Sequence, residues 1–120
     1  MTHSTTDLLN RNLHDIFGEP DPGRRRAAVD EILLEDCVFY APTGVYRGRD
    51  EIDRVAGAVR EMHPDFQYQP IQPPETLGDS GRIRWVSGPP DGPAVYAGTD
   101  FILVRDGRIA AIYLFFDQLP

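Results

Sequence analysis

The sequence predicts an α+β domain in which helices pack on one side of a mostly antiparallel sheet. Apolar residues recur at helical spacing in the first half of the chain, and from Phe66 onward they alternate as they do in strands. The strands follow the helices instead of alternating with them, which argues against a parallel βαβ arrangement. The length of 120 residues corresponds to a single domain, expected over residues 1–120.

Three helices are predicted. The first has apolar residues at helical spacing up to Phe17, with Thr5 or Thr6 as its N-cap, and it ends in the Gly- and Pro-rich segment 18–23. The second begins at Asp21-Pro22, an N-cap followed by proline at the first helical position, and continues through residues 24–34. The third covers about residues 49–62, and its apolar stripe consists of Ile52, Val55, Ala56, Val59 and Met62.

The strands have β-type alternation and are bounded by turn residues. A short strand at residues 37–41 lies between the second and third helices and ends in a turn at residues 42–44. Later strands are expected at residues 66–71, 76–77, 82–87, 94–104 and 109–116. Residues 89–93 and 105–108 are expected to form hairpin loops.

The last two predicted strands are apolar on both faces. A strand that is apolar on both faces is covered on both faces, and three helices can cover only one side of the sheet. We therefore expect a second copy of the chain to cover the other side as a homodimer. The side chains expected at this contact are Phe101, Leu103, Tyr113 and Phe115.

Charge and composition argue against several classes of function. A formal net charge of −7 argues against nucleic acid and anionic membrane surfaces as partners, because both need a basic footprint. No apolar run reaches the length of a membrane span, and the N-terminus has no signal-peptide pattern. Cys37 is the single cysteine and cannot form an internal disulfide, and no cysteine–histidine spacing fits zinc. We therefore expect a cytoplasmic protein without a cofactor or metal.

Five segments have a characteristic order and spacing: residues 35–42 (EDCVFYAP), 46–52 (YRGRDEI), 63–66 (HPDF), 98–101 (GTDF) and 104–109 (VRDGRI). In this order the chain, from Asp7 to Pro120, resembles the SnoaL-like branch of the NTF2-like superfamily. The resemblance implies a cone-shaped barrel with a curved sheet, an apolar cavity between helices and sheet, and a homodimer through the outer sheet face. Members include polyketide cyclases, ketosteroid isomerases, epoxide hydrolases, dehydratases and non-catalytic binding proteins, so the function has to be argued from the site.

Asp100 is the foremost candidate site residue. It lies in the middle of an apolar strand, where an unpaired charge is costly to bury, and it shares its strand face with Tyr96. A carboxyl group in an apolar cavity has a raised pKa and can donate a hydrogen bond to a substrate oxygen. The resemblance implies the same role, because Asp100 matches the oxyanion-stabilising aspartate of ketosteroid isomerases. The alternative is a structural aspartate bonded to the backbone, Arg82 or Arg84.

The isomerase pattern is incomplete in this chain. Ala41 stands where the resemblance places the catalytic-base aspartate, and Asn12 falls near the position of the oxyanion-hole tyrosine. The strand at residues 82–87 carries no carboxylate, as the Arg-x-Asp arrangement of epoxide hydrolases would require. Steroid isomerisation by the family's route is therefore not expected.

His63 and Tyr96 are the candidates to assist Asp100 in catalysis. His63 could act as a general base or could simply interact with carbonyls at the end of its helix. Tyr40 could donate into the cavity mouth or direct its hydroxyl to solvent, and Trp85 could line the cavity or belong to the core. Cys37 is expected to be inert core, and the run of residues 24–26 (RRR) to be a solvated basic face or an anion site. The predicted ligand-binding set is Trp85, Tyr40, Phe39, Val59, Met62, Ile112 and Phe116.

These features leave three functions open. The first is a cofactor-independent isomerase, cyclase or hydrolase acting on a small apolar molecule of polyketide or steroid type, with Asp100 as the acid. The second is a module that binds a small apolar ligand without chemistry. The third is a protein–protein adaptor, which is disfavoured because the outer sheet face is expected to be used for self-association. The first two differ in whether two titratable groups converge in the cavity.

Overall fold

The computed structural model describes residues 3–120, and its helices occupy the first half of the chain. The first helical region consists of α1 (Thr5–Arg11) and a π-helical continuation, η1 (Asn12–Phe17). It is followed by α2 (Pro22–Ile32) and α3 (Gly48–Met62). Asp21 caps α2 by accepting a hydrogen bond from the backbone N–H of Arg24, as its position before Pro22 predicts.

Seven strands form one sheet in the described part of the chain, residues 3–120. They are β1 (Leu33–Ala41), β2 (Gly44–Arg47), β3 (Gln67–Pro70), β4 (Glu75–Leu77), β5 (Ser80–Gly88), β6 (Tyr96–Arg105) and β7 (Arg108–Asp117). Their order is β2-β1-β7-β6-β5-β3, and β4 also pairs with β5. Only the β1–β7 pairing is parallel, so the sheet is mostly antiparallel as predicted.

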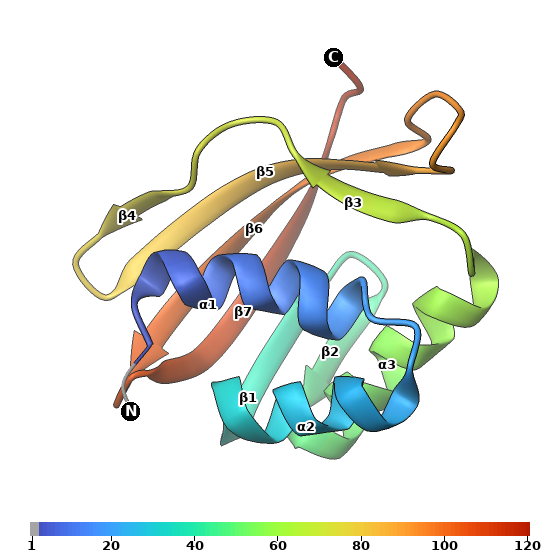
Figure 1. Cartoon of the computed structure of the whole chain (residues 1–120). Coiled ribbons are helices and arrows are strands. Elements are labelled where there is room, and N and C mark those ends of the chain that lie inside the picture. The colour runs from blue at the N-terminus through green and yellow to red at the C-terminus, as the bar shows by residue number, and fades with distance from the viewer. Residues whose placement is uncertain (1–2) are drawn as a thin grey trace.

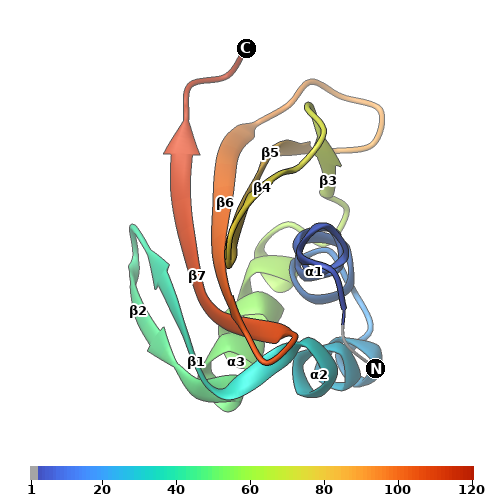
Figure 2. The same cartoon turned by 90° about the vertical axis from the view of Figure 1, so that its left-hand side faces the viewer.

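The sheet curves around the helices (Figure 1). The view along the sheet shows α1, α2 and α3 on its concave side (Figure 2). A continuous apolar core fills the space between them and includes Leu13, Ile32, Ile52 and Ile102. Within residues 3–120, no other element covers the convex face of β6 and β7. The predicted arrangement of helices on one side of a sheet is confirmed.

Several element boundaries differ from those predicted. The N-cap of α1 is Ser4, not Thr5 or Thr6, and its hydroxyl accepts a hydrogen bond from the N–H of Asp7 at 3.1 Å. The strand predicted at residues 37–41 begins four residues earlier, at Leu33, and shortens α2. Gly44–Arg47 forms a strand that the sequence pattern does not predict, and it pairs with β1 across the turn at residues 42–43.

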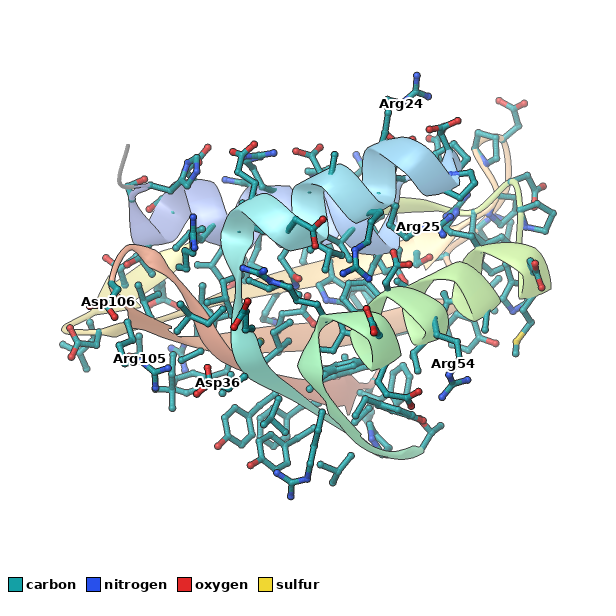
Figure 3. All side chains as sticks on the ribbon, turned by 90° about the horizontal axis from the view of Figure 1, so that it is seen from below. Arg24, Arg25, Asp36, Arg54, Arg105 and Asp106 are labelled. Atoms are coloured by element: carbon teal, nitrogen blue, oxygen red, sulfur yellow. The ribbon has the colours of Figure 1, made fainter. Side chains whose placement is uncertain are left out.

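The arginine run at the start of α2 makes its polar contacts within the chain. Arg24 reaches toward Glu19 from an exposed position, whereas Arg25 lies between α2 and α3 (Figure 3). The guanidinium of Arg25 donates to the carbonyl oxygens of Glu19 and Pro20. Arg26 pairs at the surface with a carboxylate of α2 and with one of α3.

Candidate functional site

A cavity of about 270 Å³ opens between the helices and the concave face of the sheet. Its walls are mostly aromatic and aliphatic side chains. They come from the end of η1, from β1 and the turn after it, from α3, and from the inner faces of β3, β5, β6 and β7. The lining residues are Phe17, Phe39, Ala41, Pro42, Thr43, Val55, Val59, Met62, His63, Tyr68, Trp85, Tyr96, Asp100, Leu114 and Phe116.

The strand register arranges the sheet side of this cavity in rows. Asp100 pairs with Ile83 and Leu114 in the innermost row. In the next row Gly98 pairs with Trp85 and Phe116. In the outermost row Ser87 pairs with both Tyr96 and Tyr68. The row of Asp100 and the row of Tyr96 are four residues apart, or about 13 Å along the strand.

Asp100 is almost completely buried, with an exposed fraction of 6%. Among residues 3–120 no arginine pairs with it, because Arg82 pairs with Glu75 and Arg84 lies beside Asp117. Burial raises the pKa of the Asp100 carboxyl to about 7, because the ionised form loses its hydration. The indole N–H of Trp85 opposes this rise in pKa but makes no hydrogen bond of normal geometry within the described chain. Burial therefore favours the neutral form of the Asp100 carboxyl.

Trp85 lies across the backbone of Gly98 on the neighbouring strand. A Cβ atom added to Gly98 would come within 2.5 Å of Trp85 Cζ2, so only glycine leaves room for the indole. The position beside Gly98 brings the indole next to Asp100 in the adjoining row. Trp85 is 4% exposed and belongs to the core while it also lines the cavity, so its two predicted roles coexist.

His63 and Tyr96 meet at the mouth of the cavity. His63 is the C-cap residue of α3, and its Nε2 lies 3.2 Å from the hydroxyl of Tyr96 at hydrogen-bonding distance. The imidazole stacks on Phe66 with ring centroids 4.1 Å apart. Both residues line the cavity that contains Asp100, so two titratable side chains, Asp100 and His63, face the same space.

Tyr68 lines the same cavity and was not among the predicted site residues. Its ring contacts Trp85 edge-on, with centroids 4.9 Å apart. Burial raises the pKa of the Tyr68 hydroxyl, and the nearby Asp100 carboxyl raises it further. The sequence pattern does not single out this residue, because Tyr68 stands between two glutamines in a short strand. Only its pairing with Ser87 shows that it shares a row with Tyr96.

The structure brings most of the predicted ligand-binding residues to the cavity but not Tyr40 or Ile112. Tyr40 is on the convex face of β1, where it stacks on Tyr113 with centroids 4.6 Å apart. Ile112 is fully buried in the core behind the cavity wall. Phe39, Val59, Met62, Trp85 and Phe116 line the cavity together with Asp100, His63 and Tyr96.

Two other predicted features are found away from this cavity. Cys37 is buried, and desolvation raises the pKa of its thiol to about 12, which makes it unreactive. Asn12 is fully buried in η1, and its amide has no hydrogen-bond partner among residues 3–120.

Among residues 3–120, no helix is both long and apolar enough to cross a membrane. In the same part of the chain, no three His, Cys, Asp or Glu side chains gather as metal ligands would.

The curved sheet with three helices on its concave side and a cavity between them defines an NTF2-like α+β cone. A model of the SnoaL-like domain matches residues 11–112, and the chain belongs to this family. No curated protein matches the sequence.

Solved structures agree with this assignment. A provisionally named isomerase of the SnoaL-like family from Agrobacterium tumefaciens is 26% identical, with 95% of this chain and 97% of that chain covered and a TM-score of 0.88. A provisionally named polyketide cyclase from Sinorhizobium meliloti is 21% identical, with 91% and 94% covered and a TM-score of 0.71. A protein with a ketosteroid isomerase-like fold from Catenulispora acidiphila, solved with trimethylamine, is 14% identical, with 95% and 88% covered and a TM-score of 0.75.

Proposed function

We propose that this protein is a cofactor-independent acid–base enzyme of isomerase, cyclase or hydrolase type that acts on a small, largely apolar oxygen-containing molecule. The observation that carries the proposal is Asp100, a buried carboxyl that faces an aromatic cavity and has no ionic partner within residues 3–120. Its pKa of about 7 keeps a large neutral fraction near neutral pH, and the neutral form can donate a hydrogen bond. The name of the Agrobacterium relative agrees with the isomerase class.

The proposed chemistry is enolisation of a ketone. Asp100 donates a hydrogen bond to the carbonyl oxygen, which stabilises the negative charge that develops there. A base removes a proton from the carbon next to the carbonyl, and the same base returns it to this carbon or to a conjugated one. His63, which stacks on Phe66 and contacts the Tyr96 hydroxyl at the cavity mouth, is our candidate for that base. One proton leaves the substrate and one returns, so the substrate and the product have the same composition.

The cavity volume limits the size of the substrate. Pockets for drug-sized ligands measure roughly 300–1,000 Å³. A cavity of about 270 Å³ therefore suits a molecule of one or two rings. The bicyclic ketone α-tetralone is a suitable probe, because it has one carbonyl oxygen and exchangeable protons beside it.

The test is exchange of the α-protons of α-tetralone for deuterium, followed by NMR in heavy water. Wild type should accelerate exchange over buffer. Asp100→Asn and His63→Gln should each slow it, by roughly 100-fold or more for a residue in general acid–base catalysis. Tyr40→Phe, on the convex face, is the control and should exchange at the wild-type rate. Exchange at wild-type rate in Asp100→Asn would contradict the proposal.

The second candidate is a binding module without chemistry. This function is favoured because the rows of Asp100 and Tyr96 lie about 13 Å apart along β6. A small substrate would have to contact groups in both rows for the acid–base chemistry to take place. The same experiment separates the two functions. Binding of α-tetralone without accelerated exchange would favour the binding module over the enzyme.

A further inference from the structure

Within residues 3–120, six side chains that line the cavity carry a polar group, and three of these groups are already engaged in hydrogen bonds. The hydroxyl of Thr43 is 3.0 Å from the hydroxyl of Tyr46. His63 and Tyr96 bind each other. The indole N–H of Trp85 is enclosed beside Asp100. Within residues 3–120, the side chains of Asp100 and Tyr68 line the cavity and make no hydrogen bond of normal geometry to another residue.

The backbones of these two residues lie in different rows of the cavity wall, and the Asp100 carboxyl is close enough to the Tyr68 hydroxyl to raise the pKa of that hydroxyl. Asp100 is in the innermost row of β6, whereas Tyr68 is in the outermost row, beside Ser87. The strands β3 and β6 are also separated by β5, which places their backbones about 10 Å apart across the sheet. Trp85 and Phe116 occupy the row between them and present apolar surface. The two residues are therefore anchored on either side of a row of apolar side chains.

We propose that Tyr68 is the second ligand-binding group of the cavity, and that the ligand is a bifunctional molecule with one oxygen bound by Asp100 and another, across an apolar ring, bound by Tyr68. The inference rests on the proposed function for the role of Asp100, and it adds a residue and a feature of the substrate. The edge-on contact with Trp85 fixes the ring of Tyr68, so its hydroxyl is held in place before the ligand arrives. A neutral phenol can both donate and accept, so it suits a ligand hydroxyl or carbonyl.

The test uses four probes with the same bicyclic skeleton. They are tetralin, which has no oxygen, α-tetralone, tetralin with a ring hydroxyl, and α-tetralone with a hydroxyl at the far end of the ring from the ketone. Trp85 is the only tryptophan of the chain and lines the cavity, so its fluorescence reports binding directly. Comparison of the four affinities separates the contribution of the ketone from that of the hydroxyl.

The variants assign each contribution to a residue. In wild type, the hydroxylated ketone should bind most tightly and tetralin most weakly. Tyr68→Phe should remove the gain from the hydroxyl, about 3- to 10-fold, and leave the gain from the ketone unchanged. Asp100→Asn should change the gain from the ketone and its pH dependence and leave the gain from the hydroxyl. Tyr40→Phe removes a hydroxyl outside the cavity and should match wild type for all four probes.

Each contrary result points to a different error. An unchanged hydroxyl gain in Tyr68→Phe, with the ketone gain altered in Asp100→Asn, would overturn the role of Tyr68 and leave the proposed function intact. Loss of the ketone gain in Tyr68→Phe would also overturn the two-ended arrangement, because both groups would then bind one oxygen. An unchanged ketone gain and pH dependence in Asp100→Asn would overturn the proposed function itself. Thermal unfolding of each variant verifies that the fold is retained.

Discussion

Asp100 illustrates how one side chain can link stability to function. An ionised carboxylate in an apolar enclosure is costly unless a cation or several hydrogen bonds compensate for its lost hydration. No such partner is present among the described residues, so the fold favours the neutral acid up to about pH 7. The same neutral acid is what a hydrogen bond to a substrate oxygen requires.

The raised pKa of Asp100 predicts how stability depends on pH. An unfolded aspartate ionises near pH 3.8 and the folded one near pH 7, so stability should fall as pH rises between these values and then level off. One pKa unit corresponds to about 1.4 kcal/mol, so the cost above pH 7 is about 4 kcal/mol at most. Asp100→Asn should remove this dependence, and its melting temperature relative to wild type should be higher at pH 8 than at pH 5.

Thermal unfolding at a series of pH values measures this effect. Asp106→Asn is a matched control, because Asp106 is exposed in the turn between β6 and β7 and has a φ of 56°, which asparagine tolerates. This control should follow the wild-type stability profile. If the melting temperatures of Asp100→Asn and wild type differ by the same amount at pH 5 and at pH 8, Asp100 does not titrate in this range.

The sequence predicts a single site residue where burial of its charge is costly or where strand alternation assigns it to the same face as another candidate. Asp100 stood out because a charge interrupts an apolar strand, and Tyr96 followed from its place on the same strand face. Tyr68 was missed because a short polar strand has no apolar alternation to assign its faces. The prediction that both Tyr40 and Phe39 bind the ligand is inconsistent with strand geometry, because adjacent strand residues point to opposite faces. Phe39 faces the cavity, so Tyr40 lies on the convex face.

At the scale of elements, β5 and β6 position the site together. Their register places Trp85 opposite Gly98 and Ile83 opposite Asp100, so the indole extends over the glycine and reaches the carboxyl. Glycine within a strand often marks a close approach of this kind. The pairing of these two strands thus determines the shape of the inner half of the cavity.

Gly98→Ala should disrupt this arrangement. The new methyl group would come within 2.5 Å of the Trp85 ring, so the indole has to move. We expect a loss of stability of about 1–3 kcal/mol, as for other overpacked cores, with a shifted Trp85 emission spectrum and weaker binding of α-tetralone. Chemical denaturation and fluorescence titration measure these effects.

A second glycine provides the control for this substitution. Gly23→Ala, in the exposed first turn of α2, adds a methyl group that meets only the Asp21 carboxylate, at 3.3 Å. Its emission spectrum and probe affinity should equal those of wild type. An unchanged spectrum and affinity in Gly98→Ala would mean that the indole is not held by the glycine.

The elements themselves were largely predictable, and the exceptions have local causes. The three helices and the later strands follow from apolar periodicity and from turn residues such as those at 105–108. The strand β2 was missed because four residues with one exposed valine carry too little alternation. The start of β1 was assigned to helix, since Leu33 and Leu34 continue the helical spacing of α2.

The two faces of the whole sheet differ in how they are covered. The concave face meets the helices and the core, whereas within residues 3–120 nothing packs on the convex face of β6 and β7 (Figure 2). That convex face carries a shallow groove with apolar side chains, among them Leu103 and Phe115, which are 38% and 58% exposed. Large contiguous apolar surfaces of this kind are uncommon on monomers.

We therefore propose that the protein is a homodimer through the convex face. The predicted contact residues Phe101, Leu103, Tyr113 and Phe115 all line this groove. A symmetric pair would cover the apolar groove of each copy with that of the other, as an isologous interface does. Sedimentation at micromolar concentration should give twice the monomer mass.

Phe115→Asp tests this arrangement, because it places an unpaired charge in the centre of the contact. Burying that charge is costly, so the variant should sediment as a monomer while it retains its circular dichroism spectrum. Ala27→Asp is the control: Ala27 is exposed on α2, on the helix side of the molecule, and does not line the groove. The control should remain a dimer. A wild-type protein that sediments only as a monomer, or a Phe115→Asp variant that stays dimeric, would show that another surface or no surface mediates self-association.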